Sequence, residues 1–285
     1  MSSVLTIMGY GFREAVRRKV FAVVVLLTAA FLVLFWLAVH YVFTRLSTIQ
    51  PPADVFVDKR TFAGAFLLGL AMFATLFLGV VLAVFLTLGV VSGDAERGLL
   101  QPLVVRPVGR ATLLLSRFLG AAVVCIVYVL AVYGIAVAII DVSGHWTPPL
   151  PLAPGLELAG GVVIAIALSL LGSVVLSATA NGIAVFMLFG AGLTAGLLGS
   201  IGHALNSPAI EHASTVAAWA LPFEALYQDG LRIISSNASG LTGFFLQLGP
   251  FGGAYVHGWG IRLWAVGFLC IALALAVFLF QRRDL

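Results

Sequence analysis

The chain has 285 residues, of which 62% are hydrophobic and only 9% are charged, and its formal net charge is +4. A soluble domain of this length carries roughly a quarter charged residues, so the composition excludes a soluble globular protein and predicts several membrane spans. The two cysteines, Cys125 and Cys270, lie within apolar stretches, which argues against a disulfide framework and against a cysteine-based metal site.

Residues 1–19 are expected to form an amphipathic helix in the headgroup region, since its apolar residues share one side and basic residues gather at its end. A signal peptide begins in the same way, but its apolar core has only about 7–15 residues. The uncharged stretch that follows here is longer and has no cleavage pattern. Residues 20–44 are therefore predicted to be the first membrane span.

Stretches without charge mark the remaining crossings, because an Asp, Lys or Arg at the centre of a membrane helix costs about 2.5–3.5 kcal/mol. About 20 apolar residues cross the hydrocarbon. The prediction is an all-α membrane protein with one domain over residues 1–285 and six transmembrane helices at 20–44, 61–91, 118–140, 158–178, 183–202 and 262–281. Between the fourth and fifth, the turn signal Thr179–Gly182 divides an uncharged stretch too long for one helix.

Small and weakly polar residues form two patterns in the fourth and fifth spans. Ser169, Ser173 and Ser177 have the spacing of one helix face, and Gly192 and Gly196 form a small-xxx-small pair. Small residues let helices approach closely in lipid. We expect these residues to pack the two spans on each other or on a second subunit; the alternative is a weakly polar wall of a translocation path.

Residues 203–258 mix charges, prolines and glycines between the fifth and sixth spans. Irregular backbone at membrane depth survives only when it is packed against protein, so short external or re-entrant helices are expected there. A seventh crossing within 233–261 is a poor alternative because that stretch contains seven glycines as well as Asn237 and Gln247. Glu224 is a candidate external gate; a solvated or ion-paired external helix is the alternative interpretation.

The basic residues indicate the orientation. With six spans and both termini in the cytoplasm, ten Lys and Arg residues are cytosolic and five are external. Residues 92–117, between the second and third spans, then form a charged cytosolic segment. We expect a short coupling helix there that docks on a partner protein, with Glu96, Arg97, Gly98, Arg106 and Pro107 as its contacts.

No catalytic pattern accompanies these features. The only lysines are Lys19 and Lys59, and neither stands in a G-x-x-x-x-G-K-[ST] phosphate-binding loop. We therefore expect no enzyme, no cofactor and no metal in this chain. A secondary transporter normally needs ionisable residues at mid-membrane, and none of the predicted spans has an Asp, Glu, Lys or Arg at its centre.

The segments 96–100 and 106–110 (Glu-Arg-Gly-Leu-Leu and Arg-Pro-Val-Gly-Arg) resemble the coupling loop of ABC-2 type transporter permeases, the membrane subunits of ATP-binding cassette exporters. The tail Phe280–Leu285 is similar to theirs as well, whereas Gln101-Pro102 departs from the pattern. The resemblance implies a separate ATP-binding subunit that holds ATP and Mg, a second permease copy, and export across a bacterial inner membrane. It implies no nucleic-acid partner. The alternative is a membrane scaffold or assembly factor without a substrate pathway.

Overall fold

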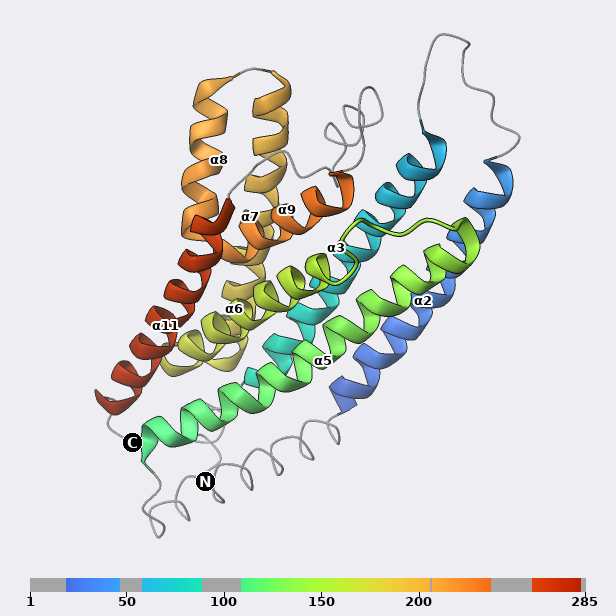
Figure 1. Ribbon diagram of the computed structural model, residues 1–285. Helices are drawn as coiled ribbons and strands as arrows, with labels where there is room; N and C mark the ends of the chain where they lie inside the picture. Colours follow the sequence, from blue (N-terminus) through green and yellow to red (C-terminus); the bar gives the residue numbers. More distant parts are fainter. Residues whose placement is uncertain (1–18, 47–57, 89–108, 206, 237–257, 283–285) are drawn as a thin grey trace.

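The computed structural model describes residues 19–46, 58–88, 109–205, 207–236 and 258–282. This part of the chain is helical (Figure 1). The helices are α2 (Lys19–Arg45), α3 (Lys59–Thr87), α5 (Arg110–Gly144), α6 (Ala153–Val175), α7 (Ala178–Ala204), α8 (Pro208–Ala220), α9 (Pro222–Ser235) and α11 (Gly258–Arg282).

Six of these helices are long and apolar enough to cross a membrane, all except α8 and α9. Their number agrees with the six predicted spans. Each span runs between two ends of the bundle, which we call the Arg110 end and the His145 end after the residues that bound α5. Helix α5 stops where His145 adopts a left-handed backbone with φ 49° and donates its N–H to the Asp141 carbonyl.

Helices α3 and α6 form the centre of the bundle and are its most buried spans. Helix α6 packs against α3, α5, α7, α9 and α11. The α6 glycines allow this close packing, since a Cβ at Gly161 would meet the backbone carbonyl of Phe223 at 3.2 Å. The core is therefore a set of interlocked helices in which α9, although too short to span, lies directly on α6.

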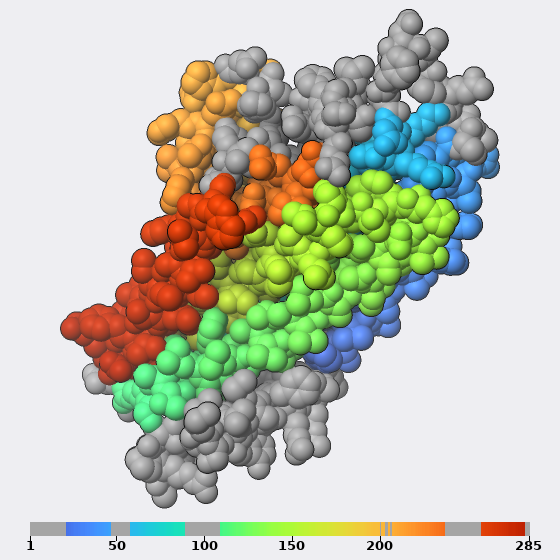
Figure 2. All heavy atoms as spheres, in the orientation of Figure 1, coloured from blue at the N-terminus to red at the C-terminus, as the bar shows by residue number. Residues whose placement is uncertain are grey.

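Helices α7 and α8 run side by side as an antiparallel pair, and α9 then crosses the bundle at a steep angle to them (Figure 1). Helices α5 and α11 approach each other at the Arg110 end, on the face shown in Figure 2. Among the described residues between the fifth and sixth spans, α8 and α9 are two short helices; whether they are external or re-entrant stays a prediction.

Two span boundaries differ from the predicted ones. Helix α5 begins at Arg110, within the predicted 92–117 segment, and its 35 residues make it about 50 Å long. A hydrocarbon core is about 30 Å thick, so α5 is long enough to project beyond the bilayer. The helix is longer than the predicted span 118–140 because Arg110 and Arg117 can extend it outside the lipid, where charge costs little.

The second difference is the break between α6 and α7, which falls at Leu176–Ser177 rather than at Thr179–Gly182. Leu176 has an extended backbone, and the Ser177 hydroxyl accepts a hydrogen bond from the Ala180 N–H at 3.4 Å. A serine hydroxyl at this position caps the new helix. The prediction missed it because the Asn-Gly pair is the more prominent turn signal, yet both residues lie in the first turns of α7.

Candidate functional site

Helix α9 is the unexpected feature of the bundle because it is polar in sequence but buried. Residues Pro222–Leu231 are all buried, including Glu224, Gln228 and Asp229. Burying a polar group is costly unless it finds a hydrogen-bond or ion-pair partner. Two groups of contacts on α9 supply such partners, and together they form the candidate site.

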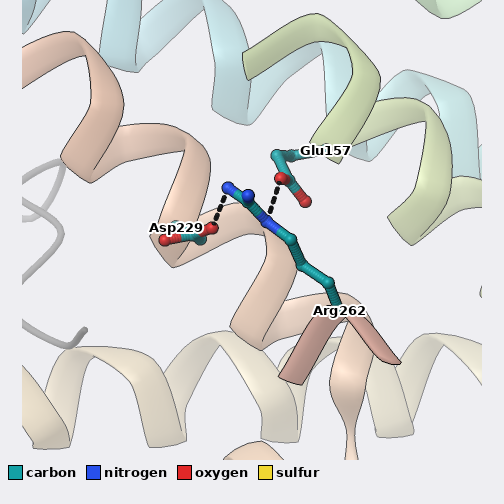
Figure 3. Close-up of polar contacts among 3 residues, drawn as sticks. All are labelled: Glu157, Asp229 and Arg262. Atoms are coloured by element: carbon teal, nitrogen blue, oxygen red, sulfur yellow. Dashed lines mark hydrogen bonds and ion pairs between the residues drawn. The ribbon is translucent and has the colours of Figure 1, made fainter. Parts of the chain in front are cut away.

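The first group is an ion triad of Glu157, Asp229 and Arg262 (Figure 3). The Arg262 Nε lies 2.8 Å from Glu157 Oε1, and its Nη2 donates to Asp229 Oδ2 at 2.6 Å. The three residues come from α6, α9 and α11, and Arg262 also lies over the Trp259 ring at 5.2 Å. The Asp229 side chain is only 5% exposed and that of Arg262 is 32% exposed, so the triad reaches the surface through its cation.

The ion triad was not predicted. The predicted fourth span begins at residue 158, directly after Glu157, and the predicted sixth span begins at Arg262. Both residues follow Pro- or Gly-rich stretches at the same predicted membrane face. That shared location was the available signal, but sequence distance alone could not show that α9 brings Asp229 between them.

The second group surrounds Glu224, which is 2% exposed. Its Oε1 accepts a hydrogen bond from Gln228 Nε2 at 2.8 Å, while its Oε2 has no partner among the described residues. Burial raises the pKa of the Glu224 carboxyl to about 8, against the lowering effect of the Gln228 hydrogen bond. Glu224 is therefore not solvated as the alternative interpretation held, and it forms no ion pair within the described part of the chain.

The glycines of α7 provide the space for this arrangement. A Cβ at Gly192 would meet the Phe223 ring at 2.6 Å, and a Cβ at Gly196 would overlap the Glu224 carboxyl. Phe223 also stacks on Phe189 of α7, with 5.9 Å between ring centroids. The small-xxx-small pair thus accommodates α9, whereas the sequence interpretation had assigned it to packing on the fourth span or on a second subunit.

The serines of the fourth span occupy different environments. Ser169 and Ser173 are fully buried in α6, and Ser177 is exposed in the break before α7. The Thr87 hydroxyl donates to Ser169 Oγ at 2.6 Å, and Asn181 Nδ2 donates to the Ser169 carbonyl at 2.8 Å. This polar node joins α3, α6 and α7 near the Arg110 end. The three serines do not form one continuous face, because the helix ends before Ser177.

Arg110 joins α5 to α11. Its Nη1 donates to the carbonyls of Phe280 at 3.4 Å and Gln281 at 3.2 Å. These carbonyls belong to the last turn of α11, where a cation compensates the unpaired acceptors and the helix dipole. The start of α5 is therefore fastened to the end of the last span. The predicted docking residues Glu96, Arg97, Gly98, Arg106 and Pro107 lie outside the described residues, as do residues 1–18.

Within the described ranges, no group of three or more His, Cys, Asp or Glu residues could hold a metal ion. Cys125 is buried and Cys270 is exposed, and both are free thiols. An open apolar groove of about 620 Å³ lies between α3 and α7 near the Arg110 end, lined by Phe85, Leu88, Ala178, Thr179, Gly182, Ile183, Phe186 and Met187.

Comparison with known proteins adds one finding at this point. A family model described as ABC-2 family transporter protein matches residues 5–285. No curated protein matches the chain. The matched range includes the charged segment 92–117, the six spans and both short helices, so the likeness extends over nearly the whole chain rather than over one motif.

Proposed function

The chain belongs to the ABC-2 family of transporter proteins, and from this we propose that it is the permease subunit of an exporter driven by a separate ATP-binding subunit. Membership makes the protein a membrane component of an ABC transporter. The observation that carries the finer proposal is the family match over a chain whose one long charged segment, 92–117, separates two spans. A segment so placed suits the docking of an ATPase, with Glu96 and Arg97 as principal contacts.

The bundle offers a rigid route from that segment to the opposite end. Helix α5 continues without interruption from Arg110 to Gly144, and Arg110 is bonded to the last turn of α11. Helix α11 in turn carries Arg262, the cation of the ion triad, in its first turns. An ATPase that binds one position of the segment more tightly than another would shift both helices, since coupling is a difference in binding free energy of about 1–3 kcal/mol.

We propose that α9 is the part of the outer gate that responds to this shift. It contacts α3, α6, α7, α8 and α11, so few of these helices can move without disturbing it. Its ion pairs to α6 and α11 run through Asp229 and the ion triad, and its contacts to α7 include Glu224 and the two glycines. Opening the His145 end would then require that one of these two groups of contacts separate.

A second permease copy completes the proposed assembly. Helix α7 presents an exposed face on which Ile183, Met187, Gly190, Ala191 and Thr194 recur at helical spacing. Gly190 has open space around it, with nothing within 4 Å of a Cβ built there. Small residues on an exposed membrane helix favour close approach of another helix. With Lys and Arg concentrated at the predicted cytosolic face, the termini and the docking segment would lie in the cytoplasm.

The experiment combines a docking variant with a charge-matched control. The double substitution Glu96→Ala/Arg97→Ala is expected to leave membrane insertion intact but to reduce both co-purification of the ATP-binding subunit and its ATPase rate in lipid nanodiscs at least tenfold. Glu211→Ala/Arg232→Ala removes the same two charges from α8 and α9 and is expected to change neither. Unchanged co-purification and ATPase rate in the first variant would contradict the proposal. A bound ATPase whose rate is independent of the permease would favour the scaffold alternative.

A further inference from the structure

A small, mostly enclosed cavity lies between α7, α8 and α9, beside Glu224. The space in which the centre of a water molecule could lie amounts to about 10 Å³, which is enough for one molecule and not for two. The cavity is lined by Ala195 and Gly196 of α7, Ser214 and Ala218 of α8, and Glu224, Ala225 and Gln228 of α9. Each of the three helices thus contributes to its wall.

The polar groups that line this cavity could form hydrogen bonds to a single water molecule. Glu224 Oε2 is buried without a partner, while Oε1 is already bonded to Gln228. The buried Ser214 hydroxyl and the Gln228 amide line the same space. Buried waters usually make two to four hydrogen bonds to such otherwise unsatisfied groups, and dry cavities of this size are normally apolar. An unbonded buried carboxyl oxygen is rare in folded proteins, so the cavity calls for an occupant.

The charges around Glu224 determine the nature of that occupant. Helix α7 has no Asp, Glu, Lys or Arg, and the Glu211 and His212 residues of α8 do not line the cavity. On the other helices that pack against α9, Arg262 of α11 is paired with Glu157 of α6 and with Asp229, and α3 has no charged residue after Arg60. The Tyr227 hydroxyl of α9 is also buried, without a hydrogen-bond partner among the described residues. With no cation beside it in the described part of the chain, an ionised Glu224 would be an uncompensated buried charge.

We propose that Glu224, Ser214 and Gln228 form a binding site for one water molecule, and that the Glu224 carboxyl occupies this site in its neutral form, with Oε2–H donating to the water. The proton is taken up from solvent when α9 packs on α7 and is returned when the two helices separate. The site therefore makes the closed arrangement of α7, α8 and α9 dependent on a bound proton. This proposal rests on the packing of α9 and does not require the transport function.

Infrared spectroscopy of the full-length protein in lipid tests the neutral carboxyl directly. The wild type is expected to show the carbonyl stretch of a protonated carboxyl at pH 7, and Glu224→Gln is expected to lose it. Asp141→Asn, which removes an exposed carboxyl near the His145 end of α5, is the matched control and is expected to retain the band. The wild-type band should also disappear as the pH is raised through about 8, a readout that needs no variant.

The water is tested in the same samples by exchange into H₂¹⁸O. An O–H stretch of an isolated water that shifts on exchange in the wild type, and that is absent in Glu224→Leu, supports the site. A wild-type protein without the carboxyl band at pH 7 would overturn the neutral state. A carboxyl band without an exchange-sensitive water band would overturn the water site. If Glu224→Leu fails to fold, Ser214→Ala provides the comparison, with the water band expected to shift or weaken.

Thermal unfolding gives an independent check of the proton. A carboxyl whose pKa is raised in the folded state binds more protons folded than unfolded, so its contribution to stability is complete below about pH 4.5 and is lost as the pH rises through about 8. The wild type is expected to lose melting temperature between pH 6 and pH 9 relative to Glu224→Gln. Parallel melting curves across that pH interval would contradict the proposal.

Discussion

At the scale of single residues, Arg262 carries an unusual share of the contacts between helices. It is one cation placed between two carboxylates, Glu157 and Asp229, on two other helices. The two carboxylates are mostly buried and would repel each other without it. The arrangement explains how α9 can bury an aspartate, and it makes the arginine rather than either acid the residue on which the group depends.

Replacing Arg262 by glutamine is therefore expected to destabilise the protein by about 1–3 kcal/mol, less than breaking a fully buried ion pair costs, because the arginine is partly exposed. The measurement is thermal unfolding in detergent at pH 7. Arg232→Gln removes an exposed arginine from α9 and is the matched control, with a change of less than about 0.5 kcal/mol expected. Equal losses in the two variants would show that the ion triad contributes nothing specific.

Residue patterns in the sequence identified important polar residues, but they did not predict which residues these would contact. Glu224 was identified as a residue of interest because it is an acid near the membrane, and Gly192 and Gly196 because of their spacing. That these three lie against one another could not be predicted, because the fold of 203–236 depends on contacts with α6, α7 and α11 that are distant in sequence. No local rule places Arg262 beside Asp229, for the same reason.

At the scale of helices, the contact between α7 and α9 depends on missing side chains. Gly196 faces the Glu224 carboxyl and Gln228, whereas Gly190 on the same helix faces open space. These two glycines are an internal comparison, since alanine raises helix propensity by the same amount, about 1 kcal/mol, at both. Any difference between them reports on the packing of α9.

Gly196→Ala is expected to lower the melting temperature, because its new methyl group must displace the Glu224 and Gln228 side chains, at a cost of about 1–3 kcal/mol typical of overpacking. Gly190→Ala is expected to be neutral or slightly stabilising. Both are measured by thermal unfolding in the same detergent. A stable Gly196→Ala variant would mean that α9 does not lie on α7 as described.

Span positions were largely predictable, since uncharged stretches identify them through the high cost of charge in lipid. The ends of the helices were not predictable, as α5 and α7 show. Arg110 and Arg117 extend α5 because a helix can continue in water, and Ser177 begins α7 because one hydroxyl satisfies a helix N–H. The burial of α9 was the least predictable feature. A helix with a polar sequence normally lies at the surface, unless its polar groups find hydrogen-bond or ion-pair partners inside the protein.

At the scale of the whole molecule, the orientation in the membrane rests on the distribution of basic residues. It predicts that the Arg110 end is cytosolic and the His145 end external. Two exposed positions report on these ends, Thr112 in the first turn of α5 and Leu152 just before α6. They suit labelling because neither side chain supports the core.

In a background where Cys125 and Cys270 are replaced by alanine and serine, Leu152→Cys is expected to react with a membrane-impermeant maleimide added to intact cells. Thr112→Cys is expected to react only after the membrane is opened. The same two variants labelled in detergent serve as controls for reactivity. The opposite pattern of labelling would reverse the orientation and move the docking segment away from any cytosolic ATPase.

The ion triad also constrains how the protein can be made. Glu157 and Asp229 leave the ribosome before Arg262, which belongs to the last helix. Until α11 emerges, Glu157 and Asp229 lack the arginine with which both form ion pairs. Helix α9 then cannot adopt its stable packed position. An unfinished chain, in which α9 is not packed, would therefore be a substrate for quality-control proteases. A stop codon anywhere before α11 should give a product that is degraded rather than a shorter working subunit.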